Sequence, residues 1–289
     1  MSASIPRENA MTFRSIFVHA DDTATCARRL DYAARFAARY PAELHGSYLP
    51  SPSELTDYAK AVMAQAEIDK YASQRAGERS AAEAAFRAAA QRAGVTRVDW
   101  DVPMRSAIGA AVLRARHSDL AILGQPSRDD PRGIFANELA NAVVTRCGRP
   151  VLFVPSVGDY PTIGERVLIA WKDSRESARA VADALPLLKN AKKVIATAVT
   201  PLADDTANER FTDAQLKAFL ARHEIDATVQ RIPAADIDAG ELLLSQAADV
   251  GADLIVMGAY SRPRLTELVW GGVTRVMLSS MTAPVLMSH

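Results

Sequence analysis

The stretch Ala252-Asp-Leu-Ile-Val-Met-Gly258-Ala-Tyr-Ser261-Arg262 is an apolar run of strand type that opens into a glycine turn. An earlier copy of it reads Ser118-Asp-Leu-Ala-Ile-Leu-Gly124-Gln-Pro-Ser127-Arg128. After each copy the same interval of 31 positions, from 119 to 150 and from 253 to 284, leads to a proline that opens a second apolar run. Self-similarity at such a long period predicts two domains of the same fold.

The composition is that of a folded protein without a strong overall charge. The chain has 289 residues, enough for two domains of ordinary size, and 49% of them are hydrophobic while 24% are charged. Lys plus Arg equals Asp plus Glu at 34 each, so no global field attracts nucleic acid or an anionic membrane. No apolar run reaches the roughly 18 residues of a membrane helix. We therefore expect neither nucleic acid nor a membrane as a partner.

The cysteines and the first residues of the chain bear on its compartment. Cys26 and Cys147 are far apart and have no Cys or His at metal-ligand spacing, so the pattern indicates neither a zinc site nor a disulfide framework. Residues 1–12 are polar and lack the apolar core of a signal peptide. We expect a cytoplasmic protein.

Short apolar runs alternate with helical patterns along both halves of the chain. The expected strands cover 15–20, 43–48, 95–101, 119–123 and 150–155, then 166–171, 193–199, 225–232, 253–257 and 284–287. The expected helices cover 25–39, 54–92 and 106–117, then 174–188, 209–223, 236–250 and 267–280. Continuous apolar strands alternating with helices predict a doubly wound parallel sheet with helices on both faces.

A turn-rich segment, residues 155–164, separates the halves and predicts domains at 13–156 and 164–289. Ile16 aligns with Val167 at an offset of 151, whereas Asp119 aligns with Asp253 at an offset of 134. The second half is therefore the shorter one, and the short helix 209–223 against the long helix 54–92 accounts for the difference. We expect the long helix to break near Ala76-Gly77, because glycine weakens a helix interior.

The glycine turn after residue 257 is the first candidate site. It leads into a helix, where free backbone N–H groups and the helix dipole can hold phosphate. Arg262 in this loop would clamp an anion, and Trp171 at the end of the strand 166–171 would cover an adenine-like ring. The alternative interpretation is structural: Gly258 only turns the chain, Gly271 and Gly272 relieve crowding, and the arginine and tryptophan are a solvated charge and a core aromatic.

The chain resembles a tandem universal stress protein, most closely in residues 253–258, in Gly271-Gly272-Val-Thr274 and in the terminal Ala283-Pro-Val-Leu. The resemblance implies two five-stranded, Rossmann-like domains and a role in stress adaptation or regulation more than in catalysis. It also implies that the domains pair through an edge strand, so we expect residues 151–154 to contact 285–287. The resemblance leaves open whether two chains also form a homodimer.

Nucleotide-binding members of that family carry the pattern G-x2-G-x9-G-[S/T], which cradles the phosphates of ATP. In the second half Gly258 and Gly271 fall in register, and Ser261 takes the place of the middle glycine. Gly272 stands at the Ser/Thr position, and Thr274 would supply the hydroxyl from two residues further on. The second half is therefore a candidate site for ATP with Mg²⁺.

Family members also place an Asp after the first strand, where it contacts the ribose. Asp21 occupies this position in the first half, but Lys172 occupies it in the second. Lysine only donates hydrogen bonds, so Lys172 would instead meet a phosphate or a carboxylate as a point charge. The first half lacks the glycine pair and carries Asp129 and Asp130 in its turn, which repel a polyphosphate. A weak Mg²⁺-dependent ATP hydrolase and a binder of some non-nucleotide small molecule remain the alternative functions.

Overall fold

The computed structural model describes residues 12–51, 63–104, 106–126, 133–201, 206–234, 237–259 and 272–289. The first half contains β1 (Ser15–Ala20), α1 (Cys26–Arg39), β2 (Glu43–Tyr48), α3 (Gln65–Ala93), β3 (Val98–Asp101), α4 (Ala107–Arg116), β4 (Leu120–Gly124), α5 (Gly133–Arg146) and β5 (Val151–Val154). The second half contains β6 (Arg166–Trp171), α6 (Arg175–Leu188), β7 (Lys193–Pro201), α7 (Thr206–Arg222), β8 (Ala227–Ala234), α8 (Ala239–Asp249), β9 (Leu254–Gly258), α9 (Gly272–Ser280) and β10 (Val285–Ser288).

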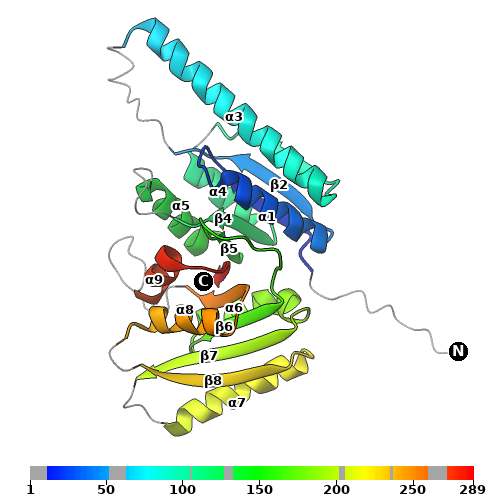
Figure 1. Cartoon of the computed structure of the whole chain (residues 1–289), viewed down its shortest axis with the longest axis vertical. Coiled ribbons are helices and arrows are strands. Elements are labelled where there is room, and N and C mark those ends of the chain that lie inside the picture. The colour runs from blue at the N-terminus through cyan, green and yellow to red at the C-terminus, as the bar shows by residue number, and fades with distance from the viewer. Residues whose placement is uncertain are drawn as a thin grey trace, which may run out of the picture.

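The strands of both halves form one sheet in the order β3-β2-β1-β4-β5-β10-β9-β6-β7-β8 (Figure 1). All neighbours within a half are parallel, and only β5 and β10 run antiparallel, with Leu152 opposite Leu286. The predicted contact between residues 151–154 and 285–287 is therefore confirmed. This pairing removes two edge strands that would otherwise offer unpaired backbone groups to other chains.

Helices cover both faces of the sheet, as the alternation of elements predicts. Helices α1, α3, α6 and α7 pack on one face, and α4, α5, α8 and α9 pack on the other. Along β1, Ile16 and Val18 belong to the first cluster of buried side chains while Phe17 belongs to the second. Each strand is therefore buried on both sides, which explains why its sequence is continuously apolar.

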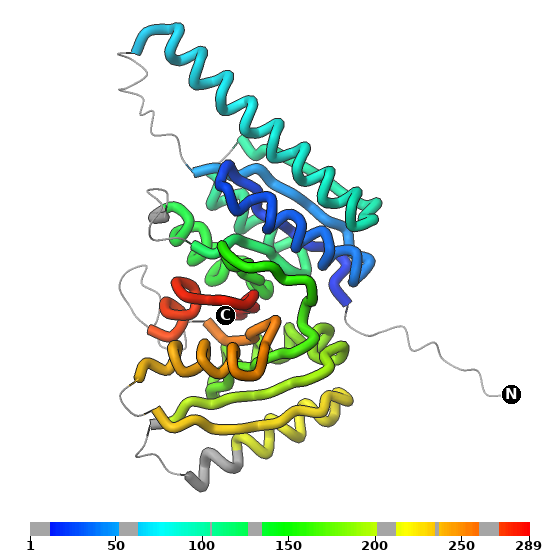
Figure 2. Tube along the Cα trace, in the orientation of Figure 1, coloured from blue at the N-terminus to red at the C-terminus, as the bar shows by residue number. Residues whose placement is uncertain are grey.

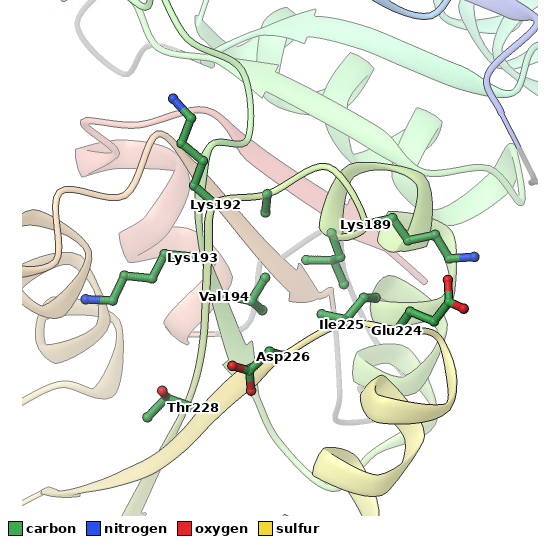
Figure 3. Close-up of a pocket in the computed structure, with 10 residues that line it drawn as sticks. Lys189, Lys192, Lys193, Val194, Glu224, Ile225, Asp226 and Thr228 are labelled. Carbon is green, nitrogen blue, oxygen red and sulfur yellow. The ribbon is translucent and has the colours of Figure 1, made fainter.

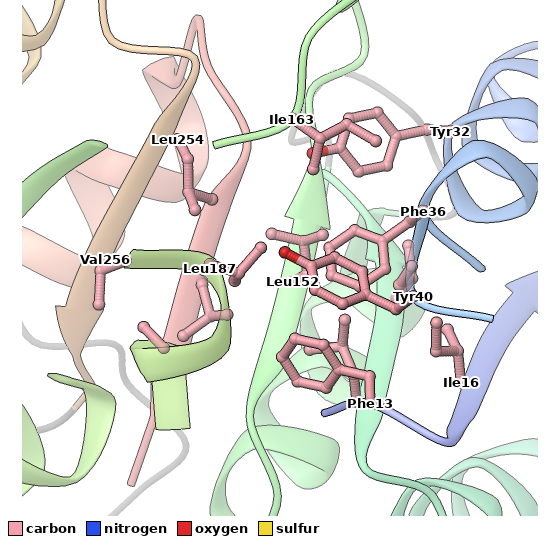
Figure 4. Packing of buried hydrophobic residues seen from close by; sticks show 14 of the residues in the cluster. Phe13, Ile16, Tyr32, Phe36, Tyr40, Leu152, Ile163, Leu187, Leu254 and Val256 are labelled. Carbon is pink, nitrogen blue, oxygen red and sulfur yellow. The ribbon is translucent and has the colours of Figure 1, made fainter. Parts of the chain in front are cut away.

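The core of the first face runs across the boundary between the halves. Tyr32 and Phe36 of α1, and Tyr40 directly after it, lie in one cluster with Ile163 of the linker and Leu187 of the second half (Figure 4). Phe36 and Tyr40 have ring centroids 4.9 Å apart. The halves thus share buried apolar surface in addition to the strand pair.

The segment between β5 and β6 is fixed by arginines of α1. This segment, residues 155–165, links the first half of the chain to the second (Figure 2). Arg35 Nη1 donates to the carbonyl of Tyr160 at 2.7 Å, and Arg28 and Arg39 donate to the carbonyls of Ser156 and Ile163. These bonds satisfy backbone acceptors that the turn-rich segment cannot satisfy by itself.

Helix α3 differs from the expectation at one point. It runs through Ala76 and Gly77 without a break over 29 residues, so the predicted interruption is wrong. A single glycine costs a helix only about 1 kcal/mol, and the surrounding Ala, Glu, Gln and Arg residues are strong helix formers. The expected start near residue 54 lies outside the described residues. The amino-terminal part of α3 extends past the sheet (Figure 1), and its buried residues begin at Ala82.

Candidate functional site

The strand order reverses once in each half, between β1 and β4 and between β6 and β9. Ligands of doubly wound sheets bind at the carboxyl ends of the strands at such a reversal. We call residues 19–29 with Gly124 the first switch point, and residues 171–180 with Gly258 the second switch point. The register pairs Val18 with Ile122 and Ala170 with Met257, so both pairs of strands end side by side.

A buried arginine occupies the first switch point. The guanidinium of Arg29 lies where a side chain on Gly124 would begin, and this arginine is only 3% exposed. Its Nη2 lies 2.9 Å from Asp21 Oδ1, and its Nε donates to the carbonyl of His19 at 2.6 Å. Asp21, the residue expected to contact a ribose, is therefore already paired.

The pKa values of this cluster follow from burial and from the Arg29 charge. Burial, and then the charge of Arg29, lowers the pKa of His19 to about 4, so its imidazole is neutral near pH 7. Burial alone would raise the pKa of Asp21, but the charge of Arg29 outweighs it and holds that pKa well below its usual range. The first switch point thus holds an ionised carboxylate against an internal cation.

The second switch point contains residues that were predicted from the sequence, but its described residues form no cluster like that of Asp21 and Arg29. Ser174 accepts a hydrogen bond from the Ser177 N–H at 3.3 Å and caps α6, as predicted. Lys172 follows the end of β6 and is exposed. Trp171 is partly buried, and its indole Nε1 is buried without a hydrogen-bond partner among the described residues. Ala180 stands where the first half has Arg29.

Glu176 is a buried carboxylate at the second switch point that the sequence pattern did not single out. It is 5% exposed, and its carboxylate accepts from Arg175 Nε. Burial alone would raise the pKa of Glu176, but the hydrogen bonds from Arg175 and from the helix start hold it below its usual value. An acidic residue in the first turn of a helix is the signal that would have indicated it.

Gly258 lies against the amino end of α6. A Cβ on Gly258 would lie 2.5 Å from the backbone N of Ser177 and 2.6 Å from the carbonyl carbon of Glu176. Close helix packing therefore requires this glycine, whether or not phosphate binds there. The alternative structural interpretation explains its presence in full.

The start of α9 holds the remaining described residues of the predicted turn. Gly272 begins the helix, and Thr274 is buried at 4% exposure. Asp238 caps α8 through the Gly240 N–H at 2.7 Å, and its other oxygen lies 3.9 Å from the position of a Cβ on Gly272. A carboxylate therefore stands at the start of α9. Ser261, Arg262 and Gly271 lie outside the described residues.

A pocket of about 310 Å³ lies at the other end of the strands, near the amino ends of β7 and β8. Leu188, Val194 and Ile225 form its buried floor, and lysines and carboxylates form its exposed rim. Lys189, Lys192 and Lys193 point away from one another (Figure 3), and Lys192 Nζ binds Glu165 at 2.8 Å. The pocket thus has solvated charges that do not converge on a ligand.

Two further kinds of site are absent from the described residues. Within the described ranges, no group of three His, Cys, Asp or Glu side chains is arranged to hold a metal ion. None of the helices in the part of the chain that the structure describes is long and apolar enough to cross a membrane.

Comparison with solved structures finds the same architecture over nearly the whole chain. A universal stress protein from Archaeoglobus fulgidus DSM 4304 is 14% identical with a TM-score of 0.70, covering 95% of both chains. A putative universal stress protein from Pseudomonas aeruginosa UCBPP-PA14 is 17% identical with a TM-score of 0.60, covering 96% of this chain and 93% of that one. The cytoplasmic domain of a prokaryotic cation chloride cotransporter is 15% identical with a TM-score of 0.51, covering 95% and 94%. These likenesses show the fold.

Comparison with curated proteins finds no match. Comparison with known families matches residues 12–155 and 164–289 separately to the universal stress protein family. Both matches span a complete five-stranded half of the sheet, which agrees with the repeated strand and turn pattern. The chain belongs to the universal stress protein family and carries two copies of its domain in tandem.

Proposed function

We propose that this protein acts in the cytoplasm as a regulatory binding protein of stress adaptation, with its ligand site at the second switch point. The first switch point is occupied by Arg29, whereas Ala180 leaves the corresponding place in the second half without a guanidinium. Among the residues that the structure describes, a ligand therefore meets no buried cation at the ends of β6 and β9. This difference between the halves supports a site in the second one.

The observation that carries the proposal is the indole N–H of Trp171. It is buried and has no hydrogen-bond partner among the residues described, which costs about 1–3 kcal/mol if nothing binds there. Indole only donates, so an acceptor atom of a ligand can serve as its partner. Lys172 follows directly and adds a positive charge. Together they favour a ligand that bears acceptors and negative charge, for which ATP is the first candidate.

Two carboxylates limit how a polyphosphate can bind. Glu176 is neutralised by Arg175, but Asp238 places a negative charge at the start of α9. Phosphate oxygens near Asp238 would be repelled unless a cation screened them. We therefore expect ATP to bind with Mg²⁺ and to bind more weakly when the metal is chelated.

Titration calorimetry with ATP, ADP and AMP tests this function. We expect one saturable site per chain with Mg²⁺ and loss of binding in Gly271→Arg, which places a bulky cation in the predicted phosphate turn. Trp171→Phe removes the indole N–H while keeping an aromatic ring, and it should weaken binding about tenfold. Neither heat nor a change in melting temperature with any of the three nucleotides would refute nucleotide binding. Native mass spectrometry of the purified chain would then identify a co-purified small molecule.

A further inference from the structure

Arg29 is a cation in a place where arginine is rarely found. It is 3% exposed, whereas Arg28, its neighbour on α1, is exposed. Arginine is almost never fully buried unless its charge is paired, because removing an ion from water carries a large desolvation penalty. The surroundings of Arg29 must therefore be built to receive a guanidinium.

Acceptor atoms converge on this guanidinium from the end of β1 and the turn that follows it. The carbonyl of His19 accepts from Nε at 2.6 Å, and Asp21 Oδ1 lies 2.9 Å from Nη2. Asp21 is itself held in place, since its Oδ1 also accepts from Thr23 N at 3.0 Å and from Thr23 Oγ1 at 2.6 Å. A fixed carboxylate and a fixed carbonyl suit the planar donor fork of a guanidinium.

Gly124 completes the arrangement at the end of β4. Any side chain there would collide with the Arg29 guanidinium, so the glycine leaves room for that group. In the second half the glycine of β9 faces backbone atoms of α6 instead. The same glycine position therefore serves two different purposes, and only the first half uses it to admit a cation.

We propose that the first switch point is a guanidinium-binding site filled by the protein's own Arg29, and that this contact closes the first half to external ligands. Asp21 is the group with which a ligand hydroxyl or cation would have to bond, and it is already occupied. A ligand can enter only by displacing a side chain that is tethered beside it at very high effective concentration. Ligand control of the protein is then confined to the second half.

The replacement Arg29→Ala tests the proposal, because it leaves the receptor intact and removes its occupant. We expect the melting temperature of the variant to fall and then to rise again by at least about 3 °C as guanidinium chloride is added to about 50 mM, far below denaturing concentrations. Urea has the same planar shape without the charge, and NaCl matches the ionic strength. Neither should reproduce the rise.

Two matched variants show whether the charge of Asp21 is responsible. Arg28→Ala removes the same kind of side chain one position away. Guanidinium should slightly lower the melting temperature of this variant, as it does that of the unmodified protein. The double variant Arg29→Ala with Asp21→Asn should lose the guanidinium-specific rise. Equal responses of Arg29→Ala to guanidinium, urea and NaCl would overturn the proposal.

A measurement on the unmodified chain tests the proposal independently if Arg29→Ala fails to fold. The Nε–H of Arg29 should exchange with solvent at least about a hundredfold more slowly than that of Arg28, because it is buried and hydrogen-bonded. NMR exchange spectroscopy of the arginine Nε–H signals measures this ratio. Equal exchange rates would show that the guanidinium leaves its site freely, and the contact would then not close the first half.

Discussion

Replacing Gly258 with alanine should destabilise the protein even in the absence of any ligand. The added Cβ would lie 2.5 Å from the Ser177 N and 2.6 Å from the Glu176 carbonyl carbon, and these are backbone atoms that cannot rotate away. The amino end of α6 must therefore move off β9. Overpacking of this kind costs about 1–3 kcal/mol, and we expect the upper end, about 3 kcal/mol, because a helix must shift rather than a side chain. At about 2 °C per kcal/mol for a chain of this size, the melting temperature should fall by roughly 6 °C.

Urea unfolding followed by circular dichroism measures the change, with Gly77→Ala as the matched control. Gly77 lies inside α3, and a Cβ there would meet nothing within 4 Å among the residues described. The same substitution at Gly77 should therefore raise the free energy of unfolding by about 0.5–1 kcal/mol, because alanine favours helix. A Gly258→Ala protein with a urea midpoint equal to that of the unmodified chain would refute the packing argument. Gly258 would then be explained only by ligand binding.

Three further outcomes are expected. Glu224 lies two residues after the end of α7 and has a φ of 63°, and the turn after α3 in the first half has Gly94 at 74°. Glu224→Gly should therefore raise the free energy of unfolding by about 0.5–1 kcal/mol in urea titrations, and a lower midpoint would contradict this. Burial holds the pKa of His19 at about 4 in the folded protein, below its value in the unfolded chain. The contribution of neutral His19 to the free energy of unfolding is therefore fully present above about pH 6.5, and about 3 kcal/mol of it is lost as the pH drops to 4. His19→Gln should flatten that loss, and an unchanged pH profile would count against it. Residues 164–289 expressed alone should self-associate through the unpaired β10, and a soluble monomer in light scattering would argue against the strand pair as the cause.

Much of the fold was predictable because it is encoded locally and then repeated. The strands around Ile16 and Val167 and the helix cap at Ser174 follow from apolar runs and capping residues, which act over a few neighbours. The break at Gly77 was wrong because helix propensity is summed over many residues and one glycine does not reverse the sum.

The candidate site was predictable only in part. Lys172 was singled out because it stands where the resemblance to the family places an acidic residue, a position that Asp21 occupies in the first half. Arg29 and Asp238 gave no comparable signal, since a charged residue on a helix is normally solvated. The signal for Glu176 was only its place in the first turn of a helix. The burial or close approach of these three residues depends on how α1, α6 and α8 pack against strands that are distant in the chain, which no local pattern contains.

The sequence by itself determined two doubly wound halves, because apolar periodicity and a repeated turn are properties of the chain alone. The strands by which the halves pair were implied by the resemblance to the family. Only the tertiary structure decided that the halves differ in chemistry. Arg29 turns inward because Gly124 admits it and Asp21 balances its charge, while Gly258 is closed by the backbone of α6. A buried charge is stable only where its partners converge in space, and that convergence exists only in the folded protein.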